Sequence, residues 1–470
     1  MSGLFSSLNA SVQALNAQSR ALETSGKNLA NVNNASYARQ RVVFGDLGTV
    51  QTPTGPESMG LQALGVEQLR DALLDRQVLR ESSRSAFYLA QQSAYQRTQA
   101  GLGQTLGSPS AATGASSTSD NGIGAALDDL FTAFQGFASS PTDSGQRQAL
   151  LQKAAILTDR FQLTDQRLAQ VQSDLDTQIG SDVTAVNGLL QSVADLNAQI
   201  GRFEINRPGS AVDLRDQRQA VLEQLAAKLP ITLTDTADGQ VLVSAQDAAG
   251  HPVRLVNLAA VTGAATFNGT QVLAGTPPTV LALDSGSIQG ALTARDGAVQ
   301  TLRDNLDRLV RQLVTSVNAA YNPTGATGDF FSAAGLTAAT IQIAPTVTAS
   351  NLKASDGGAA GDNTVARAIA QLASTRFATA SGDPIDGTFS NFYANSVSGL
   401  GQALAGVNSQ VSNQTNIEQL VRTQRDGVSG VSLDEEMAAL LKYQRAFQAS
   451  SRVFNTIDTL LDNVVNQLGR

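Results

Sequence analysis

The sequence predicts a mainly α-helical protein with a β-rich insertion, built from terminal coiled-coil helices, a discontinuous elongated helical bundle and a small β domain. Three observations support this prediction. Apolar residues recur every seven positions near both ends of the 470-residue chain. Helical spacing continues through residues 143–228, and it gives way to a spacing of two after Pro230. The first two patterns indicate helices, and the third indicates strands.

The N-terminal segment carries a heptad seam, which is typical of a coiled-coil helix. The seam consists of Leu8, Leu15, Leu22 and Leu29, with Phe5 and Val12 on the neighbouring offset. It ends at the asparagine-rich stretch 28–34. We therefore expect one helix that ends there and presents its apolar seam to a partner helix.

The C-terminal segment carries a second seam of the same kind. Its residues are Leu440, Phe447, Phe454, Leu461 and Leu468, and Tyr443, Ile457 and Val464 widen the stripe. Ser432 and Glu435 have the spacing of a capping box, and the acidic residues 434–436 suit the positive end of a helix dipole. One helix over 433–468 is therefore predicted. Burial of five seam residues contributes roughly 7–15 kcal/mol, whereas ordering the backbone costs about 1–2 kcal/mol per residue, so this helix needs a partner.

Between the two seams the predicted elements are mainly helical. Residues 61–100 contain a helical stretch, and residues 101–124 form a linker rich in glycine, serine, threonine and alanine. The longest helical signal runs from Leu150 to about Arg207, and a second helix follows at 214–225. This length of helical periodicity predicts a rod-like helical domain.

The change of period after Pro230 predicts a β-rich insertion. Ile231 and Leu233 alternate with threonines before a turn at 237–239, and Val241 and Val243 continue the alternation after it, so we expect a hairpin. Further short strands are expected at 253–256, 266–267 and 280–283, and helices return at 302–317, 365–373 and 391–426.

Three domains follow from this order of elements. They are a terminal coiled-coil assembly domain (1–45 with 430–470), a discontinuous helical bundle domain (46–228 with 289–429) and a β-rich inserted outer domain (229–288). Because the insertion interrupts helical segments, the bundle must be assembled from parts of the chain that are distant in sequence.

Composition argues against an enzyme and against several binding functions. The formal charge is −8 with no basic block, which disfavours nucleic acid and anionic membranes as partners. The chain has no cysteine and a single histidine, His251, which is expected in an exposed turn. A catalytic triad or zinc site is therefore improbable, and we expect no catalytic, cofactor-binding or metal-binding residue. No apolar run reaches membrane-spanning length, and the first 19 residues lack the features of a cleaved signal peptide.

Two motifs carry a family resemblance. Asn28-Leu29-Ala30-Asn31-Val32-Asn33, followed by Tyr37-Ala38-Arg39-Gln40, resembles the N-terminal motif of bacterial flagellar axial proteins, the family of rod, hook and hook-associated proteins. Residues 430–465 are similar to the C-terminal motif of that family. The hook-associated branch, of FlgK-type hook–filament junction proteins, is the most similar. Arg39 after Tyr37-Ala38, the segment 213–218 and Asp329-Phe330-Phe331 favour this branch.

The resemblance implies a structural subunit of the flagellum at the junction between hook and filament. Such a subunit is exported unfolded without a cleaved signal and is extracellular once assembled. Its implied partners are further copies of itself in a helical array, the hook protein, a second hook-associated junction protein and a cytoplasmic flagellar export chaperone. No cofactor, nucleic acid or membrane insertion is implied. The contact between copies would be heterologous and would propagate as a helical array.

The candidate assembly residues lie at both ends of the chain. In the N-terminal helix and motif they are Leu8, Val12, Leu15, Leu22, Asn28, Leu29, Asn31, Tyr37, Arg39 and Gln40. In the C-terminal helix they are Leu433, Leu440, Tyr443, Phe447, Phe454, Ile457, Leu461, Val464 and Leu468. From spacing alone, the apolar residues fit the core of an intramolecular bundle better, and it is their location at both ends and the family resemblance that favour assembly. The polar residues of the motif could bond between subunits or cap the loop locally.

Two other functions stay open at this point. One is a hook, rod or flagellin-type axial subunit, against which the long helical run 143–228 and the Tyr37-Ala38-Arg39-Gln40 motif argue. The other, of a different class, is a surface adhesin or binding module on a flagellar scaffold, carried by the insertion 229–288.

Limited proteolysis of the purified monomer tests whether the ends are assembly elements. We expect cleavage of roughly residues 1–60 and 430–470 while the middle of the chain resists, because marginal helices open locally without a partner. Mass spectrometry of the surviving core identifies the cut sites. If the ends resist together with the middle, they belong to a self-sufficient bundle, and the assembly interpretation of the heptads loses its physical basis.

Overall fold

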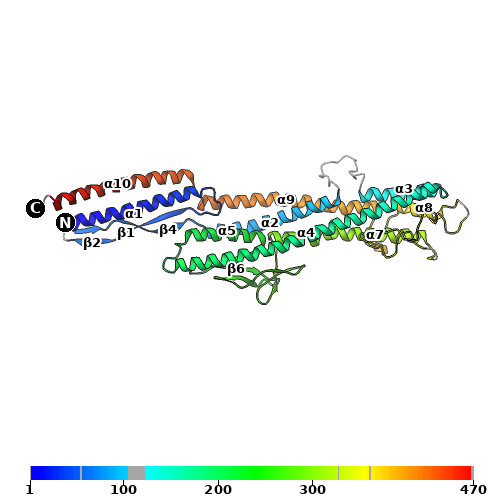
Figure 1. The fold of residues 1–470 in the computed structure, drawn as a ribbon, viewed down its shortest axis with the longest axis horizontal. Helices are drawn as coiled ribbons and strands as arrows, with labels where there is room; N and C mark the ends of the chain where they lie inside the picture. Colours follow the sequence, from blue (N-terminus) through cyan, green and yellow to red (C-terminus); the bar gives the residue numbers. More distant parts are fainter. Residues whose placement is uncertain (1, 53–54, 104–121, 326–327, 359–360, 467–470) are drawn as a thin grey trace. The chain divides into compact units, whose positions relative to one another are not determined.

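The structure is a computed structural model that describes residues 2–52, 55–103, 122–325, 328–358 and 361–466. Its contacts divide the chain into two compact units. Unit 1 comprises residues 1–85, 182–286 and 414–470, and unit 2 comprises residues 86–181 and 287–413. This division differs from the three domains predicted from the sequence, because it groups the insertion with both ends of the chain. The mainly helical fold class with small antiparallel sheets is confirmed (Figure 1).

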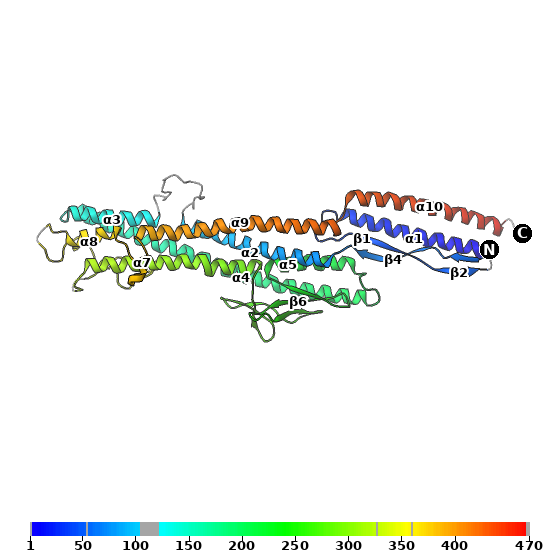
Figure 2. The same cartoon turned by 180° about the vertical axis from the view of Figure 1, so that it is seen from behind.

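The two ends of the chain pair within unit 1, as the heptads predict. Helix α1 (Ser2–Ala30) packs along helix α10 (Leu433–Asn466), and both views draw the two helices side by side (Figures 1 and 2). The predicted end of the first helix near residue 30 is confirmed. Residues 467–470, which include the predicted seam residue Leu468, lie outside the described residues.

A long hairpin, which the sequence did not predict, covers α1. Strand β1 (Gln40–Asp46) pairs antiparallel with β4 (Leu61–Gln68), and β2 (Thr49–Thr52) pairs with β3 (Gly55–Ser58). The first part of the expected helical stretch 61–100 is therefore a strand. Helix α2 begins only at residue 72 and spans Ala72–Leu102. These strands are short and their alternation is weak, so their pairing with α1 decides their conformation.

The β-rich insertion is confirmed, and it is tied to two helices of unit 1. Helix α4 (Ser144–Glu204) is the long helix that the sequence predicts, and α5 (Val212–Lys228) follows it. The predicted hairpin is β5 (Thr232–Asp235) with β6 (Val241–Gln246), and β7 (Pro252–Asn257) and β8 (Ala260–Val261) extend the sheet in the order β5-β6-β7-β8. A second sheet has the order β11-β10-β9, from β9 (Thr266–Phe267), β10 (Val272–Ala274) and β11 (Thr279–Val280).

One buried asparagine explains why the insertion groups with the helices. Asn197 of α4 donates to the carbonyls of Val241 and Leu258, at 2.8 Å each, and accepts from Arg218 of α5 at 2.9 Å. Burial lowers the pKa of Arg218 to about 10, so its guanidinium is still charged at neutral pH. A buried polar group without these partners would be costly, so this network fixes the sheet to the helix pair.

Unit 2 is a helical bundle around an aromatic core. Its own helices are α3 (Ile123–Ser139), α6 (Gly286–Ala294), α7 (Gln300–Tyr321) and α8 (Thr364–Gln371), with a π turn at Arg295–Val299 and 3-10 turns at Leu372–Ser374 and Thr379–Ser381. Parts of α2, α4 and α9 (Phe389–Ser429) complete the unit. Phe330 is fully buried against Phe134 and Tyr321, with ring centroids 5.3 and 5.5 Å away. Most of the linker expected at 101–124 lies outside the described residues.

Removing Phe330 should destabilise unit 2 strongly. Phe330→Ala leaves a cavity among three aromatic rings, and we expect the free energy of unfolding to fall by about 3–5 kcal/mol. Urea unfolding followed by circular dichroism measures the loss. Phe203→Ala is the control, because Phe203 is 64% exposed and its removal should change stability by no more than about 0.5 kcal/mol. Equal effects of the two substitutions would contradict this account of the core.

Candidate functional site

The buried face of α1 differs from the predicted seam. Its fully buried residues are small or polar: Ser11, Ala17, Ala21, Thr24, Ser25 and Asn28. The heptad leucines Leu8, Leu15, Leu22 and Leu29 are only half-buried, and Val12 is exposed. Small side chains let the neighbouring strands and α10 approach closely, so the leucines lie at the edges of this contact.

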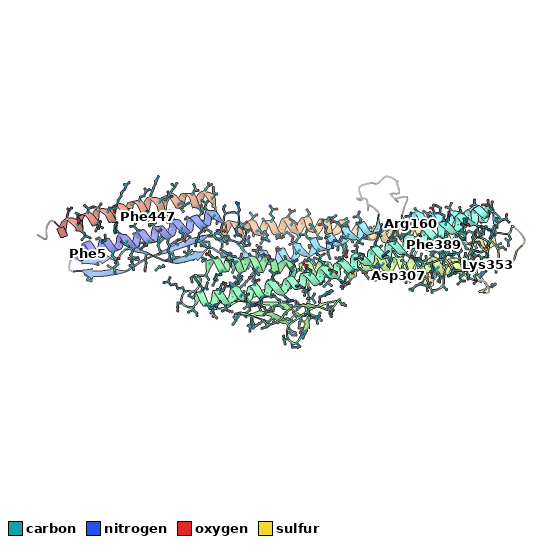
Figure 3. The ribbon with its side chains drawn as sticks, viewed as in Figure 1. Phe5, Arg160, Asp307, Lys353, Phe389 and Phe447 are labelled. Atoms are coloured by element: carbon teal, nitrogen blue, oxygen red, sulfur yellow. The ribbon has the colours of Figure 1, made fainter. Side chains whose placement is uncertain are left out.

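The seam of α10 divides between an inner and an outer face. Five residues of the seam face α1 and the strands beside it, because they are at least half-buried. These are Leu440, Tyr443, Phe454 and Ile457, which are half-buried, and Leu461, which is buried. The ring of Tyr443 lies 6.2 Å from that of Phe44 on β1. Leu433 and Phe447 are exposed instead, and Phe5 of α1 is exposed as well (Figure 3). Val464 lies in α10, but its side chain is outside the described set.

The outer face of α10 carries apolar residues, of which the sequence analysis identified only Leu433. Leu433, Met437 and Leu441 are spaced by four and are 52%, 48% and 54% exposed. A spacing of four places them on one side of a helix, and we call them the outer ridge. Val453 and Leu460 are exposed further along the helix. Leu433 is in step with the heptad, whereas Leu441 is one residue out of step with it. Within the chain, α1 and β1 therefore cover only the inner face of α10.

The polar residues of the N-terminal motif form a turn that is bonded within the chain. The side chain of Asn28 is buried and donates to the Gln40 carbonyl at 2.8 Å, while its Oδ1 accepts from the Gln40 N–H at 3.0 Å. The same Oδ1 accepts from the Tyr37 hydroxyl at 2.9 Å. Burial, with Asp216 nearby, raises the pKa of Tyr37, which keeps this donor protonated. Asn31 donates only to the Lys27 carbonyl one turn earlier.

Arg39 joins this turn to the start of α10. Its guanidinium bonds to Glu435 and, at 2.7 Å, to Glu436, whose side chain is 2% exposed. Its backbone N–H donates to the Ser429 carbonyl at 2.8 Å, at the end of α9. The capping-box prediction is met only weakly, because the Glu435 N–H lies 3.5 Å from the Ser432 hydroxyl and its carboxylate binds Arg39. The acidic residues at this helix start therefore hold the two ends of the chain together.

A buried arginine lies beneath the turn, between two carboxylates. Arg70 donates to Asp75 at 2.9 Å and to Asp216 of α5 at 2.5 Å. Asp216 also accepts from the Ala38 N–H at 3.2 Å, and Gln40 donates to Asp213 at 2.8 Å. Burial raises the pKa of Asp216 to about 6, and the charge of Arg70 opposes this rise. No local pattern indicates these pairs, because Arg70 and Asp216 are far apart along the chain.

A second cluster fixes the end of α9 to α5. The side chain of Arg425 is 4% exposed, and it donates to Glu223 at 2.7 Å and to the Ala35 carbonyl at 2.7 Å. Arg422 donates to the same carboxylate at 2.9 Å. We call the ion pairs of Arg39, Arg70 and Arg425 together the charged joint. The joint holds the turn after α1, helix α5 and the connection from α9 to α10 in one arrangement.

The single histidine and the acidic side chains are the remaining groups to consider. His251 is exposed and pairs with Asp247 at 3.3 Å, as expected for a histidine in a surface turn. Within the described ranges no group of three or more histidine, aspartate or glutamate side chains is placed to hold a metal ion. No described helix combines the length and the apolar character that crossing a bilayer requires.

The raised pKa of Asp216 predicts a pH dependence of the charged joint. The folded state binds a proton at about pH 6, above the ordinary aspartate value, so the stability from this group is complete below about pH 4 and is lost as pH rises through 6. Stability should fall by up to about 1.4 kcal/mol per pH unit in this window. Hydrogen exchange of peptides from α5, in urea at pH 5, 6 and 7, measures this fall in stability. Asp216→Asn should flatten the slope, whereas the exposed Asp238→Asn should not; a slope unchanged by Asp216→Asn would contradict the assignment.

Comparisons with known proteins match the whole chain. The model of the flagellar hook-associated protein FlgK helical domain matches residues 113–331, and that of the flagellar basal body rod FlgEFG protein C-terminal region matches residues 426–468. Flagellar hook-associated protein 1 of Bacillus subtilis (strain 168) is 24% identical over 523 residues, which cover 100% of this chain and 99% of the relative. The protein of the same name from Escherichia coli (strain K12) is 24% identical over 565 residues, covering 98% and 99%.

A solved structure is also similar in part. The flagellar hook junction protein FlgK from Burkholderia pseudomallei has a TM-score of 0.45 at 20% identity, over 55% of this chain and 46% of that chain. The family assignment depends on the sequence matches, which include both the helical middle and the C-terminal helix and extend from end to end in the relatives. These matches confirm the resemblance of the terminal motifs. The chain is similar from end to end to flagellar hook-associated protein 1, and its helical middle matches the FlgK family model.

Proposed function

We propose that this chain is a structural subunit of the bacterial flagellum that forms the junction between hook and filament, and that it assembles there through its terminal helices. The observation that carries the proposal is the outer ridge of α10. Its three apolar side chains are about half exposed, while the inner face of the same helix is engaged within the chain. Exposed apolar residues gathered on one helix face are typical of a protein interface.

One face of α10 packs within the chain and the other is exposed, and this difference supports assembly in one orientation. The inner face pairs with α1 and β1, and Arg39 fixes the start of the helix through Glu435 and Glu436. A helix held in this way presents its outer ridge in one orientation, which reduces the entropy lost on binding. Leu8, Leu15, Leu22 and Leu29 of α1 are only half-buried, so they are further apolar side chains that a neighbouring copy could cover.

The same family role implies which partners this chain contacts and where it is located. We infer that copies of this chain contact each other, the hook protein below and a second hook-associated junction protein above. The chain reaches this extracellular site by flagellar export without a cleaved signal, and a cytoplasmic chaperone holds the C-terminal helix beforehand. Hook, rod and flagellin-type roles are disfavoured, because both end-to-end relatives reported above are named flagellar hook-associated protein 1. A binding role for residues 229–288 stays a prediction.

A charge on the outer ridge should block assembly and leave the monomer folded. We replace Leu441 by Glu in the bacterium that encodes the chain, and we count hooks that carry the chain by immunoelectron microscopy. We expect at least a tenfold loss, because burying an unpaired carboxylate in an apolar contact is costly. The free energy of unfolding should change by no more than about 0.5 kcal/mol, since Leu441 is exposed.

The matched control is Gln444→Glu, which adds the same charge to an exposed polar position of the same helix. It should assemble like the unmodified chain. Secreted Leu441→Glu protein in the growth medium would show that export is intact. Normal numbers of hooks carrying Leu441→Glu would overturn the proposal.

A further inference from the structure

An exposed loop of unit 1 carries an apolar knob flanked by arginines. It comprises the last turn of α4 and the start of the loop to α5, and its side chains Phe203 and Ile205 are 64% and 75% exposed. Arg202 and Arg207 flank them and are exposed as well. Within the described ranges neither arginine forms an ion pair, and Arg202 donates only to the Ala198 carbonyl. We call residues 202–207 the basic knob. The heptads and the outer ridge leave this feature unexplained.

The knob is held rigidly by the residue at its centre. The carboxylate of Glu204 is 1% exposed and accepts from Arg215 at 2.8 and 2.7 Å and from the Ala211 N–H at 3.0 Å. Because Glu204 points inward, its two apolar neighbours point outward. Burial opposes ionisation of Glu204, but the bonds from Arg215 and from backbone N–H groups dominate and lower its pKa, so it stays charged. A preformed apolar projection of this kind loses little entropy on binding.

A groove with the opposite character lies elsewhere in unit 1. It has a volume of about 540 Å³ and runs between the turn after α1 and the connection from α9 to α10. Val32, Val428 and Val431 line it, with the carboxylates of Asp426 and Glu435 at its edge. The side chains of these two acids are 57% and 62% exposed. We call it the acidic groove.

Each of the two groove carboxylates shares its arginine partner with a second carboxylate. Asp426 accepts two long bonds from Arg425, at 3.4 Å each, and the same buried guanidinium bonds more closely to Glu223 at 2.7 Å. Arg39 bonds to Glu435, but the same guanidinium also bonds to the buried Glu436. An apolar ligand that brings its own cations is therefore the complementary partner.

We propose that the basic knob of one copy docks into the acidic groove of the next copy, as a second contact between subunits. The proposal rests on the assembly role proposed above and adds a surface outside the terminal helices. Apolar side chains meet valines, and Arg202 and Arg207 approach Asp426 and Glu435. Two different surfaces on one chain make a heterologous contact, which propagates along an array.

Crosslinking tests this contact directly, because the chain has no cysteine of its own. We introduce Ile205→Cys and Val428→Cys together and treat isolated hook–filament structures with a short bismaleimide. We expect a ladder of multimers on a denaturing gel, at least tenfold above that of either single variant. The matched control pairs Ile205→Cys with Ile156→Cys, which is also exposed but lies in unit 2. If the doubly substituted chain is present at the junction and yields no ladder, the docking is wrong and the assembly role stands.

Charge reversal provides a second test that does not depend on crosslinker geometry. Arg202→Glu with Arg207→Glu should reduce incorporation at hook ends at least tenfold, with an unchanged thermal unfolding curve by circular dichroism. Adding Asp426→Arg should restore much of the loss. Arg308→Glu with Arg311→Glu is the control, since both arginines are exposed on α7. Normal incorporation of the knob variant would overturn the docking, whereas absence of the unmodified chain from hooks would overturn both proposals.

Discussion

Pairing of buried charges at the charged joint is the constraint on which the arrangement of unit 1 depends. Arg39, Arg70 and Arg425 each meet a carboxylate from a distant part of the chain; the side chain of Arg425 is almost fully enclosed, and those of Arg39 and Arg70 are mostly covered. Removing one partner from a buried pair commonly costs about 3–5 kcal/mol, because the other charge is left without compensation. The joint therefore permits one arrangement of the turn after α1, helix α5 and the two C-terminal helices. An apolar contact of the same size would define that arrangement less sharply.

The terminal layer combines internal pairing with a surface kept for other molecules. Helix α1 buries small side chains such as Ala17 and Ala21, so its contact with the hairpin and α10 is close but yields modest hydrophobic free energy. The outer ridge stays exposed on α10. A net charge of −8 keeps such a chain soluble before assembly. Contacts within the chain can thus order α10, and contacts with neighbouring subunits can cover its outer ridge. This combination suits a subunit that is added to a growing structure.

Local patterns predicted much of the fold, and the misses have identifiable causes. Helix α4, the hairpin β5–β6 and the C-terminal helix follow from periodicity within a single segment. Helix α3 was missed although Leu127, Leu130, Phe134 and Phe137 have helical spacing, because it directly follows the long linker. The β1–β4 hairpin was missed because its strands are short and contain glycine, and only packing against α1 stabilises them. Of the candidate site, the motif 28–40 was identified but its partners were not.

By itself the sequence determined which segments are helical, where the β insertion lies and that both ends carry apolar seams, because each of these depends on neighbours within a few turns of the chain. Only the tertiary structure decided which residues of each seam are enclosed. Leu461 faces inward and Leu441 faces outward although both are apolar residues of one helix. It also decided that Asn28 and Arg39 bond within the chain, since their partners Gln40 and Glu436 are brought to them by the fold. Such choices depend on contacts between residues that lie from 12 to nearly 400 positions apart, and no helix or strand period encodes those distances.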